Sequence, residues 1–200
     1  MNKCIIVGAC KESLNDFTYD KDDFIIASDG GYSFLKEKGY PVHLVVGDFD
    51  SLKYVPSEDN IIKLDVIKDV TDTHEAIEEG IKKGYKDFVL YGCFGGREDH
   101  SFASIQELLH FKKRGINIIL KGKEKTFEVL MNETKEFKGV GYISVFSLTD
   151  VSKGVTLKNL KYELTNQTLL SSFPLGVSNE FIANKKATIS ILDGCLLIIY

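Results

Sequence analysis

Long hydrophobic runs are missing from this 200-residue sequence, which excludes a membrane-spanning helix and a secretory signal peptide. The short apolar stretch after Lys3 ends at Ala9, so it is expected to be a first strand. Cysteine is also scarce, and the four residues Cys4, Cys10, Cys93 and Cys195 form no CxxC pair, which argues against a zinc site or a disulfide framework. These absences favour a soluble cytoplasmic protein.

An excess of positive charge is lacking as well. The net charge of −4 gives no general attraction to nucleic acid or to an anionic membrane, so neither is expected as a partner. Several catalytic signatures are absent, among them GxSxG and HExxH. The segment GKEKT at 122–126 lacks the upstream glycine of a phosphate-binding Walker loop.

Strands and helices alternate in the first part of the chain, which predicts a mostly parallel α/β sheet covered on both faces. Predicted strands are Cys4–Val7, Phe24–Ala27, Leu44–Val46, Ile61–Leu64, Phe88–Tyr91 and Ile116–Leu120. Predicted helices are Tyr32–Lys38, Asp72–Lys83 and Ser101–Arg114. We therefore expect an α/β domain over residues 1–122.

The pattern changes near Lys121–Lys125, after which short strand-like segments replace helices, and an antiparallel β-sandwich or barrel is expected over residues 123–200. The predicted strands are Phe127–Leu130, Tyr142–Phe146, Lys161–Leu164, Thr168–Leu170, Ala187–Leu192 and Cys195–Tyr200. Asp193-Gly194 between the last two predicts a β-hairpin.

Aspartates follow the apolar runs of the first part again and again. They occur in SDGG (Asp29), GDFDS (Asp48 and Asp50), DVTD (Asp69 and Asp72) and GGREDH (Asp99). An open α/β sheet gathers the ends of its strands along one edge, so these carboxylates are expected to converge. Carboxylates packed together repel one another unless a hard cation lies among them, which suggests Mg²⁺ and phosphate chemistry.

Each motif also has a simpler interpretation. Asp48 and Asp50 could belong to a polar turn, and Asp72 with Glu75 resembles a helix capping box. Yet a helix N-terminus also favours anions, where Thr71 or Thr73 could bond phosphate. The glycines before Arg97 allow close approach to phosphate, although Arg97 and Asp99 could be a mere surface ion pair.

Together these motifs resemble the thiamine pyrophosphokinase family, also called thiamine diphosphokinase. SDGG, GDFDS, DVTDT and GGREDH, with the helix that follows through Gln106, occur in the order and spacing of that family. The second part agrees in LKNLKYEL at 157–164 and GVSNEF at 176–181, so the resemblance covers essentially the whole chain. It implies an α/β nucleotide-binding domain, a β-sandwich used for thiamine binding and dimerisation, and a homodimer.

The resemblance also implies the reaction, in which diphosphate passes from ATP to thiamine, AMP leaves and Mg²⁺ assists. It assigns roles to residues by class. Implied metal ligands are Asp29, Asp48, Asp50 and Asp72; implied catalytic residues are Asp48, Asp50, Asp72 and Arg97. Implied ATP contacts are Asp29, Gly30, Thr71, Thr73, Asp99 and His100; implied thiamine contacts are Gln106, Ser178 and Asn179.

One departure from the family is the absence of tryptophan, which in some members forms a wall against the thiamine rings; Phe173 or Phe181 could replace it. Three alternatives stay open. An apolar strand that leads into DxD also begins the haloacid-dehalogenase phosphatases, whose first aspartate is a nucleophile. The chain could instead be a sensor that binds Mg–ATP without consuming it, or a related diphosphokinase with a pterin-type acceptor.

Overall fold

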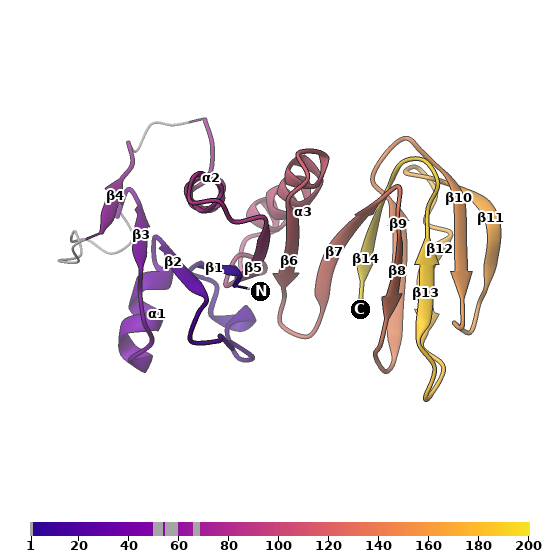
Figure 1. Ribbon diagram of the computed structural model, residues 1–200, viewed down its shortest axis with the longest axis horizontal. Coiled ribbons are helices and arrows are strands. Elements are labelled where there is room, and N and C mark those ends of the chain that lie inside the picture. Colours follow the sequence, from indigo (N-terminus) through magenta and orange to yellow (C-terminus); the bar gives the residue numbers. More distant parts are fainter. Residues whose placement is uncertain (1, 50–53, 55–59, 66–68) are drawn as a thin grey trace. The chain divides into compact units, whose positions relative to one another are not determined.

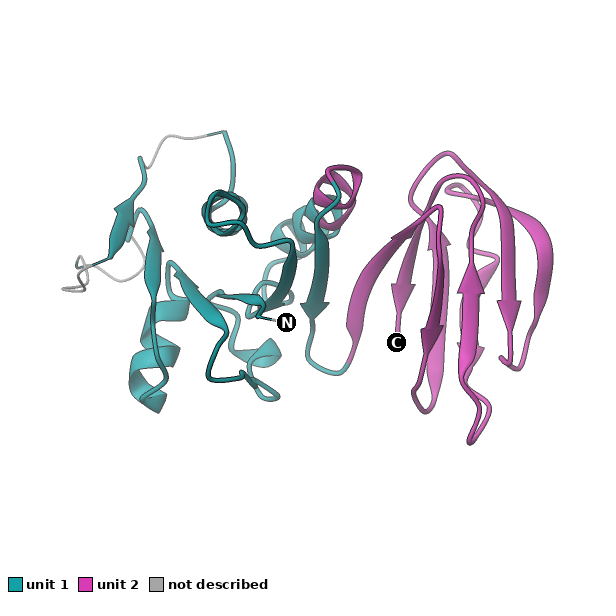
Figure 2. Ribbon diagram, viewed as in Figure 1, with its two compact units in different colours: residues 1–107, 115–124 teal, residues 108–114, 125–200 magenta. Residues whose placement is uncertain are grey.

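The computed structural model describes residues 2–49, 54, 60–65 and 69–200. The chain divides into two compact units, unit 1 with residues 1–107 and 115–124 and unit 2 with residues 108–114 and 125–200 (Figure 2). The domain boundary between residues 122 and 123 that the sequence suggests stays a prediction. No helix in the described ranges is both long enough and apolar enough to cross a membrane.

Unit 1 is built on a parallel sheet with the strand order β6-β5-β1-β2-β3-β4. Its strands are β1 (Cys4–Val7), β2 (Phe24–Ser28), β3 (Leu44–Gly47), β4 (Ile61–Lys63), β5 (Asp87–Tyr91) and β6 (Asn117–Lys121). The inner strands are buried end to end, as expected when both faces are covered. The predicted parallel α/β architecture is confirmed.

Two helices cover opposite faces of this sheet (Figure 1). α1 (Gly31–Lys38) places Leu35 in the hydrophobic cluster formed by Ile5 and by the strand residues that share its face. α2 (Asp72–Lys82) buries Ala76, Ile77 and Gly80 on the other face. Because successive side chains of a strand alternate in direction, neighbouring residues of one strand serve different helices.

α3 (Glu98–Lys113) begins three residues before the predicted helix, directly after the glycine loop that follows β5. His74 of α2 lies against it, with Nδ1 2.9 Å from Oε2 of Glu107. A short 3₁₀ helix, η1 (Lys11–Ser13), follows β1 and was not predicted.

Unit 2 consists of antiparallel strands, as predicted, arranged with the orders β12-β9-β14-β7 and β11-β10-β13-β8. The strands are β7 (Thr126–Met131), β8 (Thr134–Phe137), β9 (Tyr142–Ser147), β10 (Val151–Lys158), β11 (Leu164–Leu170), β12 (Gly176–Glu180), β13 (Ala187–Ser190) and β14 (Cys195–Ile199). Residues from both sheets form one core, including Ile143, Leu157, Ile189 and Leu196. This is the sandwich arrangement.

The predicted hairpin at Asp193-Gly194 is wrong. β13 pairs with β8 and β10, whereas β14 pairs with β7 and β9 in the other sheet. Asp193 forms a bridge to Lys153, and a Cβ at Gly194 would lie 2.9 Å from Oγ of Ser152, so the pair crosses between sheets. The predicted strand at Lys161–Leu164 is also largely wrong, because only Leu164 lies in a strand. Before Leu164 the chain turns, and the N–H group of Lys161 donates to the carbonyl oxygen of Glu180 in β12.

The fit of α2 onto the sheet leads to a prediction at Gly80. A Cβ at this position would lie 2.5 Å from a ring carbon of Phe88 and 3.0 Å from Sγ of Cys4. We expect Gly80→Ala to lower the free energy of unfolding by about 1–3 kcal/mol, because overpacking outweighs the gain of ~1 kcal/mol in helix propensity. Urea unfolding followed by circular dichroism measures the difference.

Lys82→Ala in the same helix is the control, since Lys82 is exposed and its ion pair with Glu79 lies at the surface. It should change the free energy of unfolding by less than about 1 kcal/mol. A Gly80→Ala variant more stable than the parent would contradict the packing described for α2.

Candidate active site at the carboxyl edge of the parallel sheet

The strand order of unit 1 creates a switch point between β1 and β5. From β1 the chain builds outward through β2, β3 and β4, and it then returns to place β5 and β6 on the other side. Loops that leave two such strands diverge, and ligands of open α/β sheets bind in the crevice between them. This rule places the crevice of unit 1 next to the loop after β1 and the loop after β5.

The two loops approach each other closely at Gly8 and Gly92. A Cβ at Gly8 would lie 2.5 Å from the carbonyl oxygen of Gly92, and a Cβ at Gly92 would lie 2.3 Å from that of Gly8. The N–H group of Cys10 donates to the Gly92 oxygen at 2.9 Å, which ties the loops together. Any side chain at positions 8 or 92 would separate them.

Asp29 and Asp48 lie at the ends of the adjacent strands β2 and β3. The N–H group of Asp29 donates to Val46 at 2.9 Å, and a Cβ at Gly47 would lie 3.1 Å from Cα of Asp29. Asp29 has φ of 44° and Phe49 has φ of 63°, the left-handed region that residues with side chains rarely adopt. Such strain clusters at functional sites, where the surrounding structure maintains it.

Phe49 explains how the strained backbone directly after β3 is held. Phe49 is 3% exposed and belongs to the cluster beneath α1. Burial of this ring fixes the backbone that leads to it from Asp48. The sequence analysis missed this residue, although an aromatic residue between two aspartates was a signal for an anchored turn.

Asp72 begins α2, and its neighbours connect it to the crevice. Thr71 is the N-cap, with Oγ1 accepting from the N–H group of His74 at 3.1 Å. Thr73 donates from Oγ1 to Sγ of Cys93 at 3.8 Å, and that sulfur lies 3.0 Å from a Cβ position on Gly8. The side-chain cap of α2 is thus Thr71 rather than Asp72.

The loop after β5 presents Arg97 at the start of α3. Arg97 donates through Nη2 to Oδ2 of Asp99 at 2.6 Å and through Nε to Oδ1 at 3.2 Å. This bidentate bond holds the pKa of Asp99 below its usual range and raises the pKa of Arg97. His100 donates its N–H group to the same carboxylate at 3.0 Å. Both Arg97 and Asp99 are exposed, so the pair orients the guanidinium without burying it.

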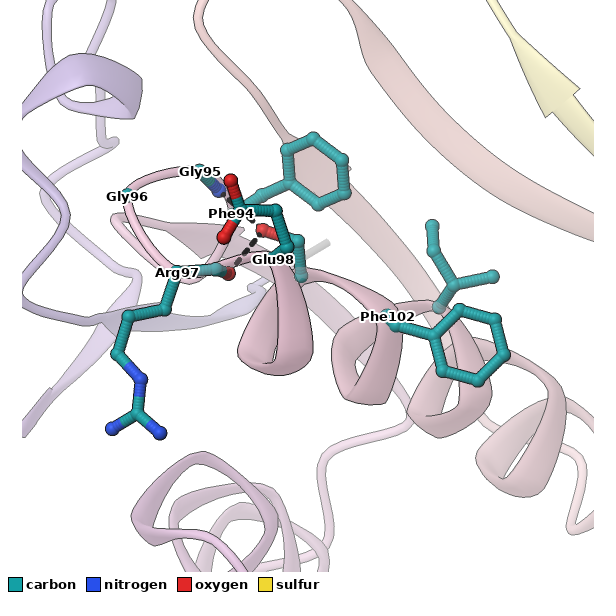
Figure 3. Close-up of a pocket in the computed structure, with 8 residues that line it drawn as sticks. Phe94, Gly95, Gly96, Arg97, Glu98 and Phe102 are labelled. Atoms are coloured by element: carbon teal, nitrogen blue, oxygen red, sulfur yellow. Dashed lines mark hydrogen bonds between the residues drawn. The ribbon is translucent and has the colours of Figure 1, made fainter.

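Beside Arg97 lies an apolar pocket of about 490 Å³ (Figure 3). Phe94, Phe102 and Ile105 form its apolar wall, and Ser101 fixes the loop by accepting from Gly95 and donating to Arg97, each at 2.9 Å. The guanidinium of Arg97 points away from the two phenyl rings (Figure 3). Phe102 is 66% exposed.

In unit 2, the two segments that carry the resemblance lie side by side. Asn179 is 4% exposed, and its side chain bonds to the backbone of Tyr162. Its Oδ1 accepts from the N–H group of Tyr162 at 3.0 Å, and its Nδ2 donates to the backbone carbonyl oxygen of Tyr162 at 2.6 Å. The side chain of Tyr162 is left 59% exposed. Ser178 is exposed, has φ of 56° and donates its N–H group to Ser144 at 3.0 Å. Asn179 therefore positions Tyr162, a residue that the sequence analysis did not select.

The predicted site residues thus fall into groups. Unit 1 brings most of them to the carboxyl edge, namely Asp29, Gly30, Asp48, Thr71, Asp72, Thr73, Arg97, Asp99 and His100. Asp50 lies outside the described residues. Gln106 is exposed on α3 and does not line the pocket beside Arg97, while Ser178 and Asn179 lie on β12. Phe181 packs against the core of unit 2, whereas Phe173 is exposed.

The chemistry of these donor groups fits a hard divalent cation. Asp29 follows β2, Asp48 follows β3 and Asp72 begins α2, so neighbouring elements of unit 1 supply three carboxylates. Oxygen ligands of this kind are those that Mg²⁺ prefers.

Comparison with protein families gives two matches that together cover most of the chain. Residues 17–120 match the model of the thiamin pyrophosphokinase catalytic domain. Residues 130–196 match the model of the thiamin pyrophosphokinase vitamin B1 binding domain. No curated protein sequence matches the chain significantly.

Solved structures of the same kind match over the full length. A thiamine pyrophosphokinase from Bacillus subtilis is 27% identical, with a TM-score of 0.87 and coverage of 100% of this chain and 98% of that one. One from Geobacillus thermodenitrificans is 27% identical, with a TM-score of 0.85 and coverage of 100% and 96%. The enzyme from Candida albicans, at 14% identity and a TM-score of 0.77, covers 99% and 88% and shows likeness of fold.

The crevice makes a prediction about thiol reactivity. Burial raises the pKa of the Cys93 thiol to about 12, although the residue as a whole is partly exposed. Only the thiolate reacts readily, and at pH 8 roughly one Cys93 in ten thousand is ionised. We expect iodoacetamide to leave Cys93 unmodified in the native protein and to modify it in urea, as measured by peptide mass spectrometry.

Cys4, whose thiol has a pKa also raised to about 12 by burial, serves as the internal reference in the core. Both cysteines should resist the reagent equally. Rapid modification of Cys93 alone in the native protein would mean that the loops after β1 and β5 separate in solution.

Proposed function

Because the chain belongs to the thiamin pyrophosphokinase family, we propose that the carboxyl edge of its parallel sheet binds ATP and that the diphosphate group passes from there to thiamine. The observation that carries this assignment is the position of Asp29 after β2, of Asp48 after β3 and of Asp72 at the start of α2, all at the carboxyl edge of the parallel sheet. Open α/β sheets bind nucleotides at such a crevice.

Asp29, Asp48 and Asp72 are the residues that would hold Mg²⁺, and Asp50, which follows Phe49 in the same motif, joins them in this proposal. A bound Mg²⁺ neutralises charge on the polyphosphate and orients it. The strained backbone at Asp29 and Phe49 keeps the two strand ends in fixed directions, so the carboxylates need little rearrangement when the nucleotide binds.

The remaining groups of unit 1 serve the phosphates. Thr71 and Thr73 lie at the N-terminus of α2, where the helix dipole favours anions. Gly92 and the glycines before Arg97 let a ligand approach the backbone closely. Asp99 holds the planar fork of Arg97, which is suited to paired phosphate oxygens.

In the reaction the hydroxyl oxygen of thiamine attacks the β-phosphorus of ATP in line, and the bond between the β-phosphorus and the oxygen of AMP breaks. Phosphoryl transfer of this kind depends on positioning and on electrostatic stabilisation more than on a strong base. The chain contributes both through groups that are fixed before the substrates arrive, among them the capped α2 and the paired Arg97.

Unit 2 supplies the contact with thiamine in this proposal. Two hydrogen bonds between the buried side chain of Asn179 and the backbone N–H and carbonyl groups of Tyr162 fix the main chain from which the exposed tyrosine ring projects. An aromatic face of this kind stacks on the flat rings of a ligand. Tyr162 thus replaces Phe173 and Phe181 as the proposed substitute for the tryptophan wall.

The homodimer implied by the family belongs to the same proposal. Phe173, Leu175 and Val177 are each about half exposed or more, and they follow one another at the entry to β12. Apolar side chains gathered in this way favour contact with another protein surface. The second copy of the chain is the partner we propose for them.

One experiment tests the reaction and the role of the carboxylates together. Purified protein with ATP, Mg²⁺ and thiamine should release AMP only when thiamine is present, and thiamine diphosphate should form in equal amount. Asp48→Asn and Asp72→Asn should each lower kcat by at least about a hundredfold, because a lost ligand weakens stabilisation of the transferred group. Chromatographic separation of nucleotides and thiamine esters gives both rates.

Asp22→Asn is the control, since Asp22 is exposed and precedes β2 at the opposite edge of the sheet. It should retain the parental rate. AMP release that ignores thiamine would point to another acceptor, whereas free phosphate without AMP would favour the phosphatase alternative. Parental turnover in both site variants would refute the metal assignment.

A second prediction concerns Tyr162. Tyr162→Ala should raise KM for thiamine about tenfold and leave KM for ATP unchanged, because only the aromatic contact with the acceptor is lost. Tyr162→Phe keeps the ring and should behave like the parent. If Tyr162→Ala has no effect on thiamine, the assignment of this ring to the acceptor is wrong.

A further inference from the structure

Three ionisable side chains of α2 and α3 lie together within unit 1, and neither the comparisons nor the proposed function uses them. His74 and Glu78 belong to α2, and Glu107 belongs to α3. Their side chains are 17%, 23% and 15% exposed, respectively. An imidazole ring and two carboxylates therefore share a place that solvent reaches only in part.

The helix itself brings His74 and Glu78 together, because residues four apart lie on one face of a helix. Nε2 of His74 lies 3.7 Å from Oε1 of Glu78, which is too far for a hydrogen bond. Two ligand atoms of one tetrahedral zinc ion, each about 2.1 Å from the metal, lie roughly 3.4 Å apart. The separation of these two atoms is therefore close to the one that a shared metal ion requires.

Glu107 orients the imidazole ring from its other side. Nδ1 of His74 lies 3.1 Å from Oε1 and 2.9 Å from Oε2 of Glu107. A carboxylate at this nitrogen favours the tautomer in which Nδ1 carries the proton, and Nε2 then presents its electron pair toward Glu78. Histidines that bind metal are typically held in this way, with the second ring nitrogen donating to a carboxylate.

We propose that Nε2 of His74 and the carboxylate of Glu78 bind a Zn²⁺ ion, with Glu107 as the positioning residue. An imidazole nitrogen beside a carboxylate oxygen suits zinc, whereas Mg²⁺ prefers oxygen ligands alone. The site is thus distinct in chemistry from the aspartates assigned to Mg²⁺. It contains no cysteine, so the absence of a CxxC pair, which argues against a cysteine-bound zinc, does not exclude it.

A zinc ion at this place stabilises the first two turns of α2. The N–H group of His74 already makes the capping bond to Thr71, and Asp72 lies two residues before His74. The hydrogen bond to Glu107 extends the connection to α3. Because the ion binds the folded chain, Zn²⁺ should raise the Tm of the parent protein and leave that of His74→Ala unchanged.

The test is a titration of the chelator-treated protein with Zn²⁺ in the presence of excess Mg²⁺, followed by isothermal titration calorimetry. His74→Ala and Glu78→Gln should each weaken zinc binding at least about tenfold, because each removes a ligand. Glu107→Gln keeps both ligands and should weaken binding by about tenfold to a hundredfold, because the ring loses its charged partner. Circular dichroism confirms that the variants fold.

Glu79→Gln is the matched control, since Glu79 lies on the same helix and pairs with Lys82 at 2.6 Å. It should bind zinc like the parent. Diffraction at the zinc absorption edge, from a crystal soaked in zinc chloride, should place an anomalous peak about 2.1 Å from Nε2 of His74.

The outcomes do not depend on which acceptor the enzyme uses. A loss of zinc affinity in His74→Ala and Glu78→Gln, with parental affinity in Glu79→Gln, supports the site. Parental affinity in both ligand variants would overturn it, and so would an equal loss in Glu79→Gln. Absence of zinc binding to the parent would also overturn it, and His74 would then serve only as an ion-pair partner of the two glutamates.

Discussion

The close approach of the chain after β1 to the chain after β5 is the constraint on which the rest of unit 1 depends. Carbonyl oxygens of Gly8 and Gly92 occupy the space that side chains would need, so the two loops share one hydrogen-bonded frame through Cys10. A Cβ at Gly31 would likewise lie 1.9 Å from the oxygen of Val7, which brings the start of α1 against the same frame. The place of α1 and of the two loops therefore depends on backbone contacts that leave no room for a side chain at these glycines.

Close backbone packing around the loop after β1 allows strained backbone conformations at the neighbouring strand ends. Asp29 and Phe49 both have left-handed backbone conformations, which cost of order 1–3 kcal/mol each. The Phe49 ring in the core and the bond from Asp29 to Val46 maintain them. The two strand ends that carry Asp29 and Asp48 therefore have fixed backbone directions, which lowers the cost of ordering them when a ligand binds. Strain in unit 1 and close glycine packing are therefore two parts of one arrangement.

Sequence patterns predicted the parallel sheet well, because buried strands of β-branched residues and glycine stops after helices are local signals. They also placed Asp29 and Asp48 at the ends of parallel strands, which share one edge of the sheet. They failed at Asp193-Gly194, where a strong hairpin signal joins strands of different sheets, since the choice of partner for β14 depends on β7 and β9 far away in the chain. Likewise, no local pattern distinguishes Asn179 as a residue that holds Tyr162.

The pockets of unit 1 illustrate why the site itself was harder to predict than its motifs. Each motif lies within a few residues of a strand end, but a pocket of about 390 Å³ on the α1 side is built from η1, the loop before β2 and α1, whose relation depends on packing around Phe17. Aromatic residues in a loop are normally interpreted as core, and Phe17 does join the core. Phe17 also lines the pocket, because the rings of Phe17, Phe34 and Tyr40 pack against one another on one side of it. A motif thus identifies the chemistry at the phosphate, whereas the side chains that select the ligand are recognised only once the fold has placed them.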